Sequence, residues 1–374
     1  MKFLLFANTD WYLYNFRLAL AVALRERGHE LVLVSPPGEY TSRIEQAGFR
    51  WAAFDFSRRG MNPLSELNTI ARLKRLYAAE KPDLVHHFTI KCVLYGSSAA
   101  HQAGNPAVVN AITGLGYMFL GRDPFVRVLR QFVKRYYRQA IKGTRVIFQN
   151  PDDLALFLQL RLAAPEQCSL IRGSGVNMER FLPSATEPTN APLVVLPSRL
   201  LWDKGVGEFV SAARSLKASG IKARFALVGD SDPHNPACVP QEQLEQWQKD
   251  GDVECWGWRE DMGAVLQQAH IVCLPSYREG VPRVLIEAAA SGRPLIATDV
   301  PGCREVVRDG ENGLLVPVRD AAALANAMRT LILDAPRRRR MGANGRALVE
   351  ANFAEEGVIQ ETLEVYRSAL GKED

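Results

Sequence analysis

The sequence predicts an α/β protein made of two Rossmann-like domains, each built on a parallel β-sheet. Three observations support this. The 374 residues exceed what one hydrophobic core usually supports. Short β-rich runs alternate with longer amphipathic stretches, which is the pattern of βαβ units. The alternation is interrupted once, by the proline-rich residues 183–192, and then starts again, as expected at a linker between domains.

The first half contains runs rich in β-branched, aliphatic and aromatic residues that we predict to be strands. Helix-length segments separate them, such as residues 16–27, which end at Gly28, and residues 63–80. Because parallel strands need long connections, usually helical, these strands are expected to form one parallel sheet. The predicted strands are residues 2–8, 29–35, 51–54, 84–87, 107–112 and 145–149.

The second half repeats this organisation. Strands are predicted at LVVLPSR, ARFALVG, VECWG, IVCLPS, PLIAT and GLLVP, and the chain from Asp320 is predicted to be helical almost to its end. We therefore expect an N-terminal domain over residues 1–184 and a C-terminal domain over residues 185–354. The last helix, about residues 355–374, is expected to pack back on the first domain. Two such sheets in tandem would face each other across a cleft at the carboxyl ends of their strands.

Composition excludes several classes of protein. Apolar residues make up 47% and charged residues 23% of the chain, which are ordinary globular values. No apolar run approaches the roughly 18–20 residues that span a bilayer. The opening MKFLLFAN has no small-residue cleavage pattern, so we expect a buried strand rather than a signal peptide. The six cysteines lie far apart without zinc-site spacing, which favours a reduced, cytoplasmic protein.

Charge is distributed unevenly along the chain. Residues 1–185 hold 24 Lys and Arg against 14 Asp and Glu, a net charge of +10. The remainder holds 22 against 27, a net charge of −5. The basic first half therefore predicts an anionic partner on that side.

Two glutamates provide the clearest functional signal. Glu279 follows a predicted strand, in a turn that Gly280 and Pro282 would hold. Glu287 lies eight positions later, within the first turns of a helix predicted from Val284. Carboxylates there would bind the hydroxyl groups of a sugar or another diol. The free N–H groups of Val284 and Leu285 would face an anion such as phosphate.

These residues resemble the hallmark of the family 4 retaining glycosyltransferases, which have the GT-B fold. The family pattern is Glu-x7-Glu followed by Ala-x-Ala-x-Gly-x-Pro, and this chain has it from Glu279 to Pro294. The sequences PSRL and DKG supply Arg199 and Lys204, similar to the family's Arg and Lys-Gly pair. The runs LVGD, WGW and GENGLLV also match in order, so the resemblance covers nearly the whole second half.

The resemblance implies a role for each of these residues. Arg199 and Lys204 would stabilise the charge on a leaving nucleoside diphosphate, a task otherwise often given to a metal ion. Glu287 would bind the ribose hydroxyls, and Glu279 a hydroxyl of the donor sugar. The backbone around Trp258 and Arg259 would bind the base. No metal and no other cofactor is expected. Each residue alone has a simpler interpretation, since such glutamates and arginines commonly lie on solvated surfaces. The tetra-arginine run at residues 337–340 is expected to be such a surface.

The first domain carries the candidate acceptor residues. The opening NTDWYLYNFR resembles a bacterial subgroup of the family, of the bacillosaminyl-diphospho-undecaprenol N-acetylgalactosaminyltransferase type, that acts on undecaprenyl-diphosphate-linked sugars. It lacks the glycine pair that many members place in this loop, so no glycine-lined phosphate cradle is expected. The runs HHFTIK and NAITGLG resemble the same subgroup, although other branches often have a second histidine where Phe88 stands.

A histidine at a strand end facing the cleft could contact substrate, and His86 is the candidate catalytic residue there. A satisfied structural histidine is the equal alternative. The polar and glycine residues near it would meet a diphosphate or sugar acceptor. The candidate acceptor-binding residues are Asn15, Arg17, Thr89, Lys91, Thr113, Gly114 and Gly116.

Residues 117–145 form the most basic stretch, with eight Lys or Arg and one Asp. Apolar residues from Phe125 to Tyr136 recur at helical spacing among the basic ones. We expect a basic amphipathic helix, about residues 124–142, that contacts an anionic membrane surface. The alternative is an ordinary domain helix with its apolar stripe in the core. No motif for binding nucleic acid accompanies the charge.

The resemblance implies a metal-independent hexosyltransferase that works with retention. Its donor would be a nucleotide sugar, preferably a UDP-linked N-acetylhexosamine. Its acceptor would be a polyprenyl-diphosphate-linked saccharide on the inner face of the cell membrane, in the synthesis of surface glycans, O-antigen or glycoproteins. Alternatives are a soluble acceptor, a nucleotide-sugar epimerase, or a phosphorylase, whose pyridoxal site cannot be placed. A dinucleotide-dependent oxidoreductase would need GxGxxG after the first strand, which is missing.

Overall fold

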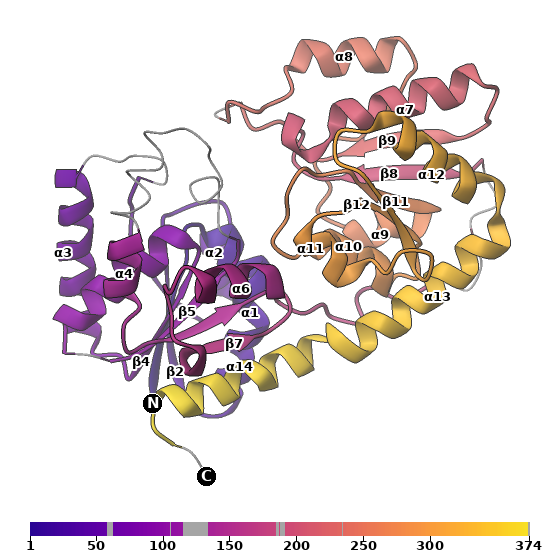
Figure 1. Cartoon of the computed structure of the whole chain (residues 1–374). Helices are drawn as coiled ribbons and strands as arrows, with labels where there is room; N and C mark the ends of the chain where they lie inside the picture. Colours follow the sequence, from indigo (N-terminus) through magenta and orange to yellow (C-terminus); the bar gives the residue numbers. More distant parts are fainter. Residues whose placement is uncertain are drawn as a thin grey trace. The chain divides into compact units, whose positions relative to one another are not determined.

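The structure is a computed structural model of the chain (Figure 1), and it describes residues 1–57, 63–104, 106–114, 134–184, 187, 191–233 and 235–372. The candidate residue Gly116 and the first part of the predicted basic helix, residues 124–133, lie outside this range. The chain forms two compact units. The first comprises Met1–Gly175 together with Glu356–Asp374, and the second comprises Val176–Glu355.

The first unit is built on a sheet of seven parallel strands in the order β3-β2-β1-β4-β5-β6-β7. This confirms the predicted parallel sheet, with every predicted strand present and a short seventh strand added. The order runs outward in both directions from β1, as in doubly wound folds. The strands are β1 (Lys2–Phe6), β2 (Glu30–Ser35), β3 (Arg50–Ala53), β4 (Leu84–Phe88), β5 (Ala107–Ile112), β6 (Arg145–Phe148) and β7 (Cys168–Leu170).

Helices cover both faces of this first sheet and enclose two apolar cores. On one face, helices α1, α2 and α14 pack over buried residues that include Leu5 and Leu33. On the other face, α3, α4 and α6 pack over residues that include Leu4 and Phe148. The helices are α1 (Asp10–Glu26), α2 (Thr41–Gln46), α3 (Pro63–Glu80), α4 (Ile90–Gln102), α6 (Pro151–Gln159) and α14 (Glu355–Ala369).

Helix α1 begins earlier than the sequence predicted. It starts at Asp10 rather than at Phe16, because the Thr9 side chain accepts a hydrogen bond from the Tyr12 N–H at 3.1 Å and caps the helix. The sequence analysis took the aromatic residues after Thr9 as a loop, so it did not recognise Thr9 as a capping residue. Most of the stretch that was taken as a loop is therefore the first two turns of a helix.

The second unit has six parallel strands in the order β10-β9-β8-β11-β12-β13. The predicted strand runs all appear in it. Figure 1 shows α7 and α8 on one side of this sheet and α10 and α11 on the other. The strands are β8 (Leu193–Pro197), β9 (Arg224–Val228), β10 (Glu254–Cys255), β11 (Ile271–Leu274), β12 (Leu295–Thr298) and β13 (Gly313–Val316).

The helices of the second unit include two that the sequence analysis did not predict, α9 and α11. Both are short, so neither shows the repeated apolar spacing that identifies a helix. The predicted C-terminal helical stretch is three helices rather than one. The helices are α7 (Val206–Ala218), α8 (Gln241–Lys249), α9 (Met262–Gln268), α10 (Arg283–Ala290), α11 (Pro301–Val306), α12 (Ala321–Leu333) and α13 (Ala335–Asn352).

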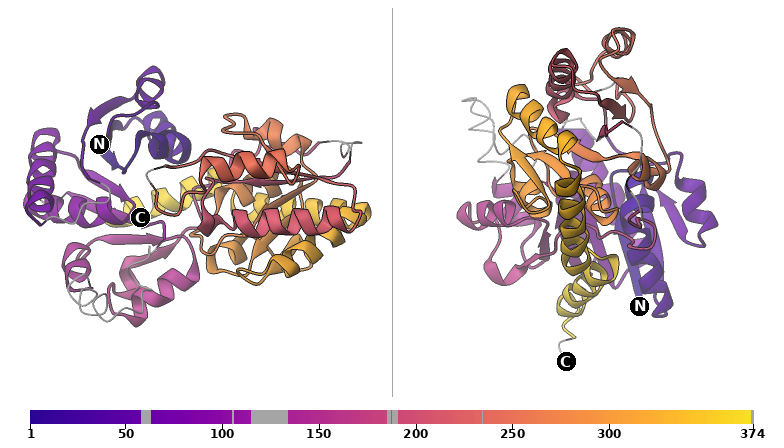
Figure 2. Two further views of the ribbon diagram at one scale, coloured as in Figure 1. Left: turned by 90° about the horizontal axis from the view of Figure 1, so that it is seen from above. Right: turned by 90° about the vertical axis from the view of Figure 1, so that its right-hand side faces the viewer.

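The second unit begins at Val176, ahead of the proline-rich residues 183–192 at which the sequence analysis divided the chain. The Val176 N–H donates to the Phe353 carbonyl at 2.9 Å, and the Glu355 N–H donates to the Val176 carbonyl at 3.1 Å. This pairing ties Val176 to the end of α13. After Glu355 the chain returns to the first unit as α14, so both termini lie there (Figures 1 and 2).

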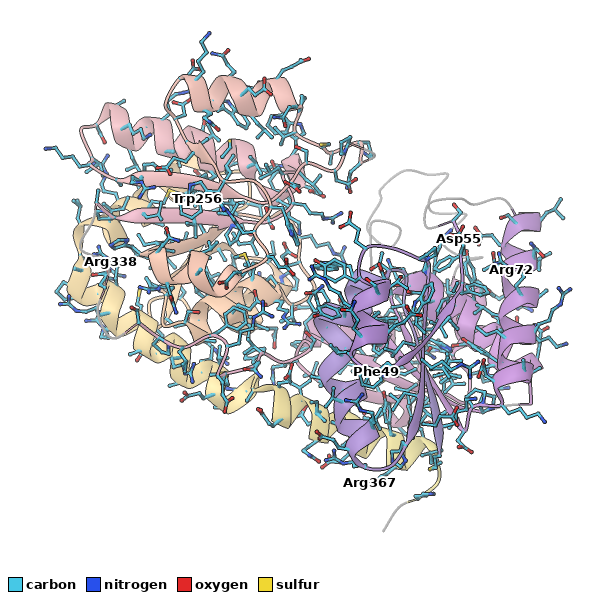
Figure 3. All side chains as sticks on the ribbon, turned by 180° about the vertical axis from the view of Figure 1, so that it is seen from behind. Phe49, Asp55, Arg72, Trp256, Arg338 and Arg367 are labelled. Atoms are coloured by element: carbon cyan, nitrogen blue, oxygen red, sulfur yellow. The ribbon has the colours of Figure 1, made fainter. Side chains whose placement is uncertain are left out.

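The tetra-arginine run is not a uniformly solvated surface. Arg338, on α13 (Figure 3), is only 5% exposed. Its guanidinium donates to the carbonyls of Leu331 and Ile332 at the end of α12, and to the Glu187 carboxylate at 2.5 Å. The exposed neighbours Arg339 and Arg340 fit the prediction, but Arg338 contradicts it because it caps a helix.

Candidate active site

Two loops at the carboxyl end of the second sheet carry the predicted donor residues. Lys204 lies in the loop between β8 and α7, and Glu279 in the loop between β11 and α10. The Lys204 ammonium donates to the Glu279 carboxylate at 2.6 Å. Their side chains are 19% and 13% exposed, so water screens this pair weakly. The structure thus brings together two residues that stand 75 positions apart in the sequence.

Two glycines allow these loops to approach closely. Gly205 has a φ of +73°, and a side chain there would overlap the carbonyl of Pro275 in the neighbouring loop. Gly302, in the first turn of α11, lies so close to Gly280 that a Cβ atom would overlap its carbonyl oxygen. The backbone that presents Glu279 is therefore packed directly against α11. The sequence analysis gave Gly302 no role.

Tyr277 ties the Lys204 loop to the Glu279 loop. Its N–H donates to the Asp203 carbonyl at 2.9 Å, and its hydroxyl donates to Glu208 on α7 at 2.7 Å. The Arg319 guanidinium lies 4.6 Å from the centre of its ring. Sequence reasoning missed Tyr277, since a tyrosine between two motif residues carries no spacing signal of its own.

Arg199 is the more exposed of the two predicted cations. It follows β8, its side chain is 61% exposed, and it lies 3.3 Å from the Asp232 carboxylate. The pairing of Arg199 with Asp232 was not predicted from the sequence. Such an exposed pair contributes little stability. Arg199 and Lys204 leave the sheet in the same loop, which concentrates positive charge at this edge.

Glu287 lies on α10 and accepts a hydrogen bond from Arg283 at 2.9 Å. Burial raises the pKa of the Glu287 carboxyl above its usual range, while the positive charges of Arg283 and Arg180 act in the opposite direction. The sequence analysis missed both arginines. Arg180 precedes the linker and belongs to no recognised motif, and Arg283 occupies one of the unspecified positions between the two glutamates of the motif.

The amino terminus of α10 differs from the predicted anion site. The helix begins after Pro282, and the Leu285 N–H donates to the Pro282 carbonyl at 3.0 Å. The prediction of a free N–H at Leu285 is therefore wrong, because a tight first turn uses this group internally. Val284 is the second residue of the helix, where N–H groups lack a partner four residues back.

The strand ends β9 and β10 carry the residues predicted to bind a base. The Gly229 N–H donates to the Gly257 carbonyl at 2.9 Å, and the Trp258 N–H donates to the Asp230 carboxylate at 3.0 Å. Trp258 is 51% exposed, unusual for so large an apolar side chain. Beside it lies a pocket of about 400 Å³, lined by Trp256, Trp258, Arg259, Glu260, Asp261, Ala264, Val265 and Gln268.

In the first unit, the structure places His86 in the core rather than on an open strand end. The residue is 1% exposed, and its Nδ1 lies 2.6 Å from the Tyr366 hydroxyl on α14. Burial, followed by the charge of Arg17, lowers the pKa of His86 well below its usual range, so the ring is neutral at pH 7. The Nδ1 contact is that of a structural histidine, whereas Nε2 is buried without a hydrogen-bond partner among the described residues.

The two polar candidates on α1 are also more enclosed than predicted. Arg17 is 5% exposed, with its guanidinium 4.4 Å from the centre of the Phe88 ring and 2.9 Å from the Tyr12 hydroxyl. The Asn15 amide donates to the Trp11 carbonyl within the helix at 3.0 Å. The earlier helix start explains Asn15, whose side chain projects from a helix and not from a loop, whereas Arg17 was already predicted to be helical.

The remaining acceptor candidates lie at the carboxyl ends of β4 and β5. Lys91, on the first turn of α4, pairs with Glu66 at 3.1 Å and donates to the Ser57 carbonyl at 3.0 Å. Thr89 has a φ of +74°, a conformation uncommon for a non-glycine residue and often found at functional sites. Thr113 and Gly114 directly follow β5.

The described part of the predicted basic helix, residues 134–142, packs into the domain. Tyr137 and Ala140 are each 1% exposed within the core under α4 and α6. The Arg138 side chain donates to the carbonyls of Leu160 and Arg161 at 2.9 and 2.8 Å. Arg135 and Lys142 are exposed. In this part, the apolar stripe belongs to the core, as the simpler alternative expected.

None of the described helices is long and apolar enough to cross a membrane. No group of three or more His, Cys, Asp or Glu side chains is placed to hold a metal ion within the described ranges.

Known proteins resemble the chain over most of its length. A family described as "Glycosyl transferases group 1" matches residues 191–334, and one described as "Glycosyl transferase 4-like" matches residues 2–150. The chain is 29% identical, over 95% of both sequences, to N,N'-diacetylbacillosaminyl-diphospho-undecaprenol alpha-1,3-N-acetylgalactosaminyltransferase of Campylobacter jejuni.

Two further similarities are informative. The chain is 24% identical to UDP-Gal:alpha-D-GlcNAc-diphosphoundecaprenol alpha-1,3-galactosyltransferase of Escherichia coli, over 72% of this chain and 71% of that protein. The crystal structure of HepE from Anabaena in complex with UDP superposes with a TM-score of 0.80 at 20% identity, covering 98% of this chain and 100% of that chain. The predicted GT-B fold is thereby confirmed.

Proposed function

The chain belongs to the family 4 glycosyltransferases, and we propose that it transfers a sugar from a UDP-sugar to a polyprenyl-diphosphate-linked saccharide. The observation that carries this proposal is the Lys204–Glu279 pair at 2.6 Å, with Arg199 in the same loop as Lys204. A cation held by a carboxylate can turn to a phosphate when a donor binds. The carboxylate is then available to a sugar hydroxyl.

In the proposed reaction, the bond between the anomeric carbon and the diphosphate breaks as the acceptor oxygen attacks from the same face. The configuration of the sugar is therefore retained. Arg199 and Lys204 stabilise the negative charge on the departing nucleoside diphosphate. A phosphate oxygen of that group takes the proton from the acceptor hydroxyl, so no protein base is assigned. Because two side-chain cations lie at this edge, we propose that the transfer needs no metal ion.

Within the donor site, we assign Glu287 to the ribose hydroxyls. Its pairing with Arg283 at 2.9 Å orients the carboxylate, and the exposed Trp258 stands beside a pocket at the adjacent strand end. Gly280 and Pro282 shape the turn between the two glutamates. The backbone at Trp258 and Arg259 is assigned to the base.

The acceptor proposal comes from the two undecaprenol-linked relatives and from the charge of the first half. Both relatives have a diphospho-undecaprenol in their names. The net charge of +10 over residues 1–185 suits a diphosphate and an anionic lipid surface. We therefore propose that the enzyme acts at the inner face of the cell membrane, with an N-acetylhexosamine as the favoured sugar. Among the acceptor candidates we favour Lys91, near Thr89, because its ammonium group has defined partners in Glu66 and the Ser57 carbonyl.

A donor and acceptor panel tests this function. UDP-, GDP- and ADP-sugars are incubated with the enzyme, with and without a polyprenyl-diphosphate-linked sugar, and nucleoside diphosphate release is measured. We expect release from a UDP-sugar that depends on the lipid-linked acceptor and persists in EDTA. If nucleoside diphosphate is released only with a soluble sugar acceptor, the enzyme uses a soluble acceptor and not a lipid-linked one. No release from any pair would contradict the proposed reaction.

A further inference from the structure

Helix α3 carries an exposed pair of leucines on its first turns. Leu64 is 78% exposed and Leu67 is 64% exposed, which places both among the most exposed large apolar side chains of the described residues. They stand three positions apart, so they are neighbours on one side of the helix. Soluble surfaces tolerate single exposed leucines, but adjacent ones on a helix commonly mark a contact site.

The leucines are not part of the stripe that holds α3 to the domain. The helix buries Leu73 and Tyr77 in the core that it shares with α4. Leu64 precedes Leu73 by nine positions, which at about 100° per residue places it on the opposite side of the helix. Figure 1 shows α3 along the outside of the first unit beside α4. The leucine side therefore faces away from the core.

The same outward side is basic. Lys74 and Arg75 are exposed there, while the two carboxylates of α3 are engaged in ion pairs. Glu66 pairs with Lys91 at 3.1 Å, and Glu80 pairs with Lys2 at 2.8 Å and also with Arg50. The helix thus presents apolar and positive groups outward without a carboxylate of its own to neutralise them. That combination suits an anionic lipid surface.

The third basic residue of α3, Arg72, has partners within the first unit. Its guanidinium donates to the Asp55 carbonyl at 3.0 Å and lies 4.9 Å from the centre of the Phe54 ring, and Figure 3 labels Arg72 and Asp55 side by side. Arg72 therefore fastens α3 to the chain after β3. Lys74 and Arg75 remain as the charges directed at a partner.

The position of the leucines relates to the acceptor side of the first unit. Lys91 bonds to Glu66, which lies between Leu64 and Leu67 on α3, and it also bonds to the Ser57 carbonyl. The first turns of α3, which carry the leucine pair, therefore lie at the carboxyl end of the sheet, and Glu66 in the same turns contacts a candidate acceptor residue. A lipid-linked acceptor keeps its hydrocarbon in the bilayer while its diphosphate and sugar reach the enzyme.

From these observations we infer that α3 docks the enzyme on an anionic bilayer, with Leu64 and Leu67 entering the interface and Lys74 and Arg75 meeting the lipid headgroups. This inference rests on the proposed lipid-linked acceptor, and it names a surface outside the basic segment at residues 124–142. Docking by α3 places Lys91 close to the headgroup layer, where the diphosphate of the acceptor lies.

Vesicle sedimentation of the full chain tests the leucines. We compare the wild type with the double variant Leu64→Ser and Leu67→Ser on phosphatidylcholine vesicles with and without phosphatidylglycerol. The wild type is expected to bind the anionic vesicles, and the double variant to bind them about tenfold or more weakly, since each buried leucine contributes to insertion. Leu333→Ser is the matched control, because Leu333 is 67% exposed on α12 of the second unit.

The charges are tested by the pair Lys74→Glu and Arg75→Glu. This variant is expected to lose about tenfold or more of its binding to anionic vesicles, because each basic residue near such a surface contributes about a fivefold factor. The control is Arg339→Glu with Arg340→Glu, two exposed residues of α13. A third arm, Lys134→Glu with Arg135→Glu, reports on the basic segment.

Four outcomes would overturn the inference. The wild type could fail to bind anionic vesicles, or the α3 variants could bind as well as their controls. Loss of binding only in the Lys134 and Arg135 arm would also move the docking site to that segment. A wild-type dimer in analytical ultracentrifugation that the leucine variant dissolves would assign the leucines to a second copy of the chain instead.

A separate measurement distinguishes this inference from the proposed function. Transfer to a short-chain, water-soluble prenyl-diphosphate-sugar is expected to be unchanged in the α3 variants, because docking is not needed for that acceptor. Equal activity with the wild type also shows that the variants fold. If the wild type lacks activity on this acceptor but still docks through α3, the proposed reaction fails and the docking surface stands.

Discussion

The Lys204–Glu279 pair is the centre of the proposed chemistry at the scale of single residues. We expect Lys204→Ala and Glu279→Gln each to lower kcat by about 10²–10³-fold, as loss of one group that stabilises a developing charge typically does. Steady-state kinetics with a saturating UDP-sugar measure this. Lys249→Ala, on the exposed end of α8, is the matched control and should retain activity. Near-normal turnover of the Lys204→Ala variant would show that Lys204 does not stabilise the leaving group.

Glu287 gives a second prediction, because its pKa is raised by burial. A carboxyl whose pKa is raised on folding favours the folded state when protonated, and this contribution is lost as pH rises through the raised value. Glu287→Gln keeps the shape without the charge. We therefore expect the ligand-free variant to be at least as stable as the wild type at pH 7, with its advantage disappearing towards the usual carboxyl pKa of about 4.3.

The same substitution should weaken binding of UDP, since Gln cannot reproduce a carboxylate on two ribose hydroxyls. Thermal unfolding between pH 4 and pH 8 and titration calorimetry with UDP measure the two effects. A variant that is less stable at pH 7 and binds UDP normally would make Glu287 a structural partner of Arg283.

Individual residues differ in how far the sequence could predict them. The order of Arg199, Lys204, Glu279 and Glu287 along the chain was enough to identify a donor site. Their partners were not predictable, because Arg180, whose charge acts on Glu287, and Asp232, which pairs with Arg199, come near them only through folding. The sequence left His86 evenly balanced between substrate contact and structure. Its burial against Tyr366, 280 positions away, favours the structural role.

At the scale of elements, helix α11 supports the loop that presents Glu279. Gly302 allows this support, since a Cβ atom there would overlap the Gly280 carbonyl. We expect Gly302→Ala to destabilise the second unit by about 1–3 kcal/mol through overpacking and to lower kcat by moving Glu279. Denaturant unfolding and kinetics measure the two changes.

Gly357→Ala is the matched control for this prediction. Gly357 lies on α14, and nothing stands within 4 Å of the position that its Cβ would take. The control should be neutral or slightly stabilising, as alanine usually is within a helix. If Gly302→Ala behaves like the control, the α11 contact does not hold the loop.

Long elements were predicted better than short ones, for a physical reason. Helix α3 repeats its apolar spacing over several turns, so its range, residues 63–80, was recognised from sequence. Helices α9 and α11 have too few turns to show a period. The start of α1 was predicted too late in the chain. The capping threonine precedes aromatic residues that bury only part of their surface, so they do not show the apolar spacing of a helix.

At the scale of the whole molecule, helix α14 returns the C-terminus to the first unit, where Tyr366 is 2% exposed. We expect Tyr366→Ala to destabilise the first unit by about 3–5 kcal/mol, as loss of a large buried aromatic side chain does. Tyr366→Phe keeps the packing but leaves His86 without its hydroxyl partner, so about 1–3 kcal/mol should be lost. Thermal unfolding of both variants measures the difference.

This pair of variants also tests the role of His86. If its bond to Tyr366 is structural, Tyr366→Phe retains kcat at a temperature well below its Tm. A large loss of kcat without loss of stability would indicate that His86 takes part in catalysis. Hydrogen exchange of β1 and β4, on which Tyr366 packs, would show whether the effect stays in the first unit.

By itself, the sequence determined the fold class, the parallel sheets and the family of the chain, because periodicity and ordered motifs are properties of neighbouring residues. It also determined which half would carry the positive charge. Only the tertiary structure decided which carboxylate holds Lys204, why Gly302 is needed, and that His86, Arg17 and Arg338 are enclosed. These depend on contacts between residues far apart in the chain, and folding alone brings such residues together.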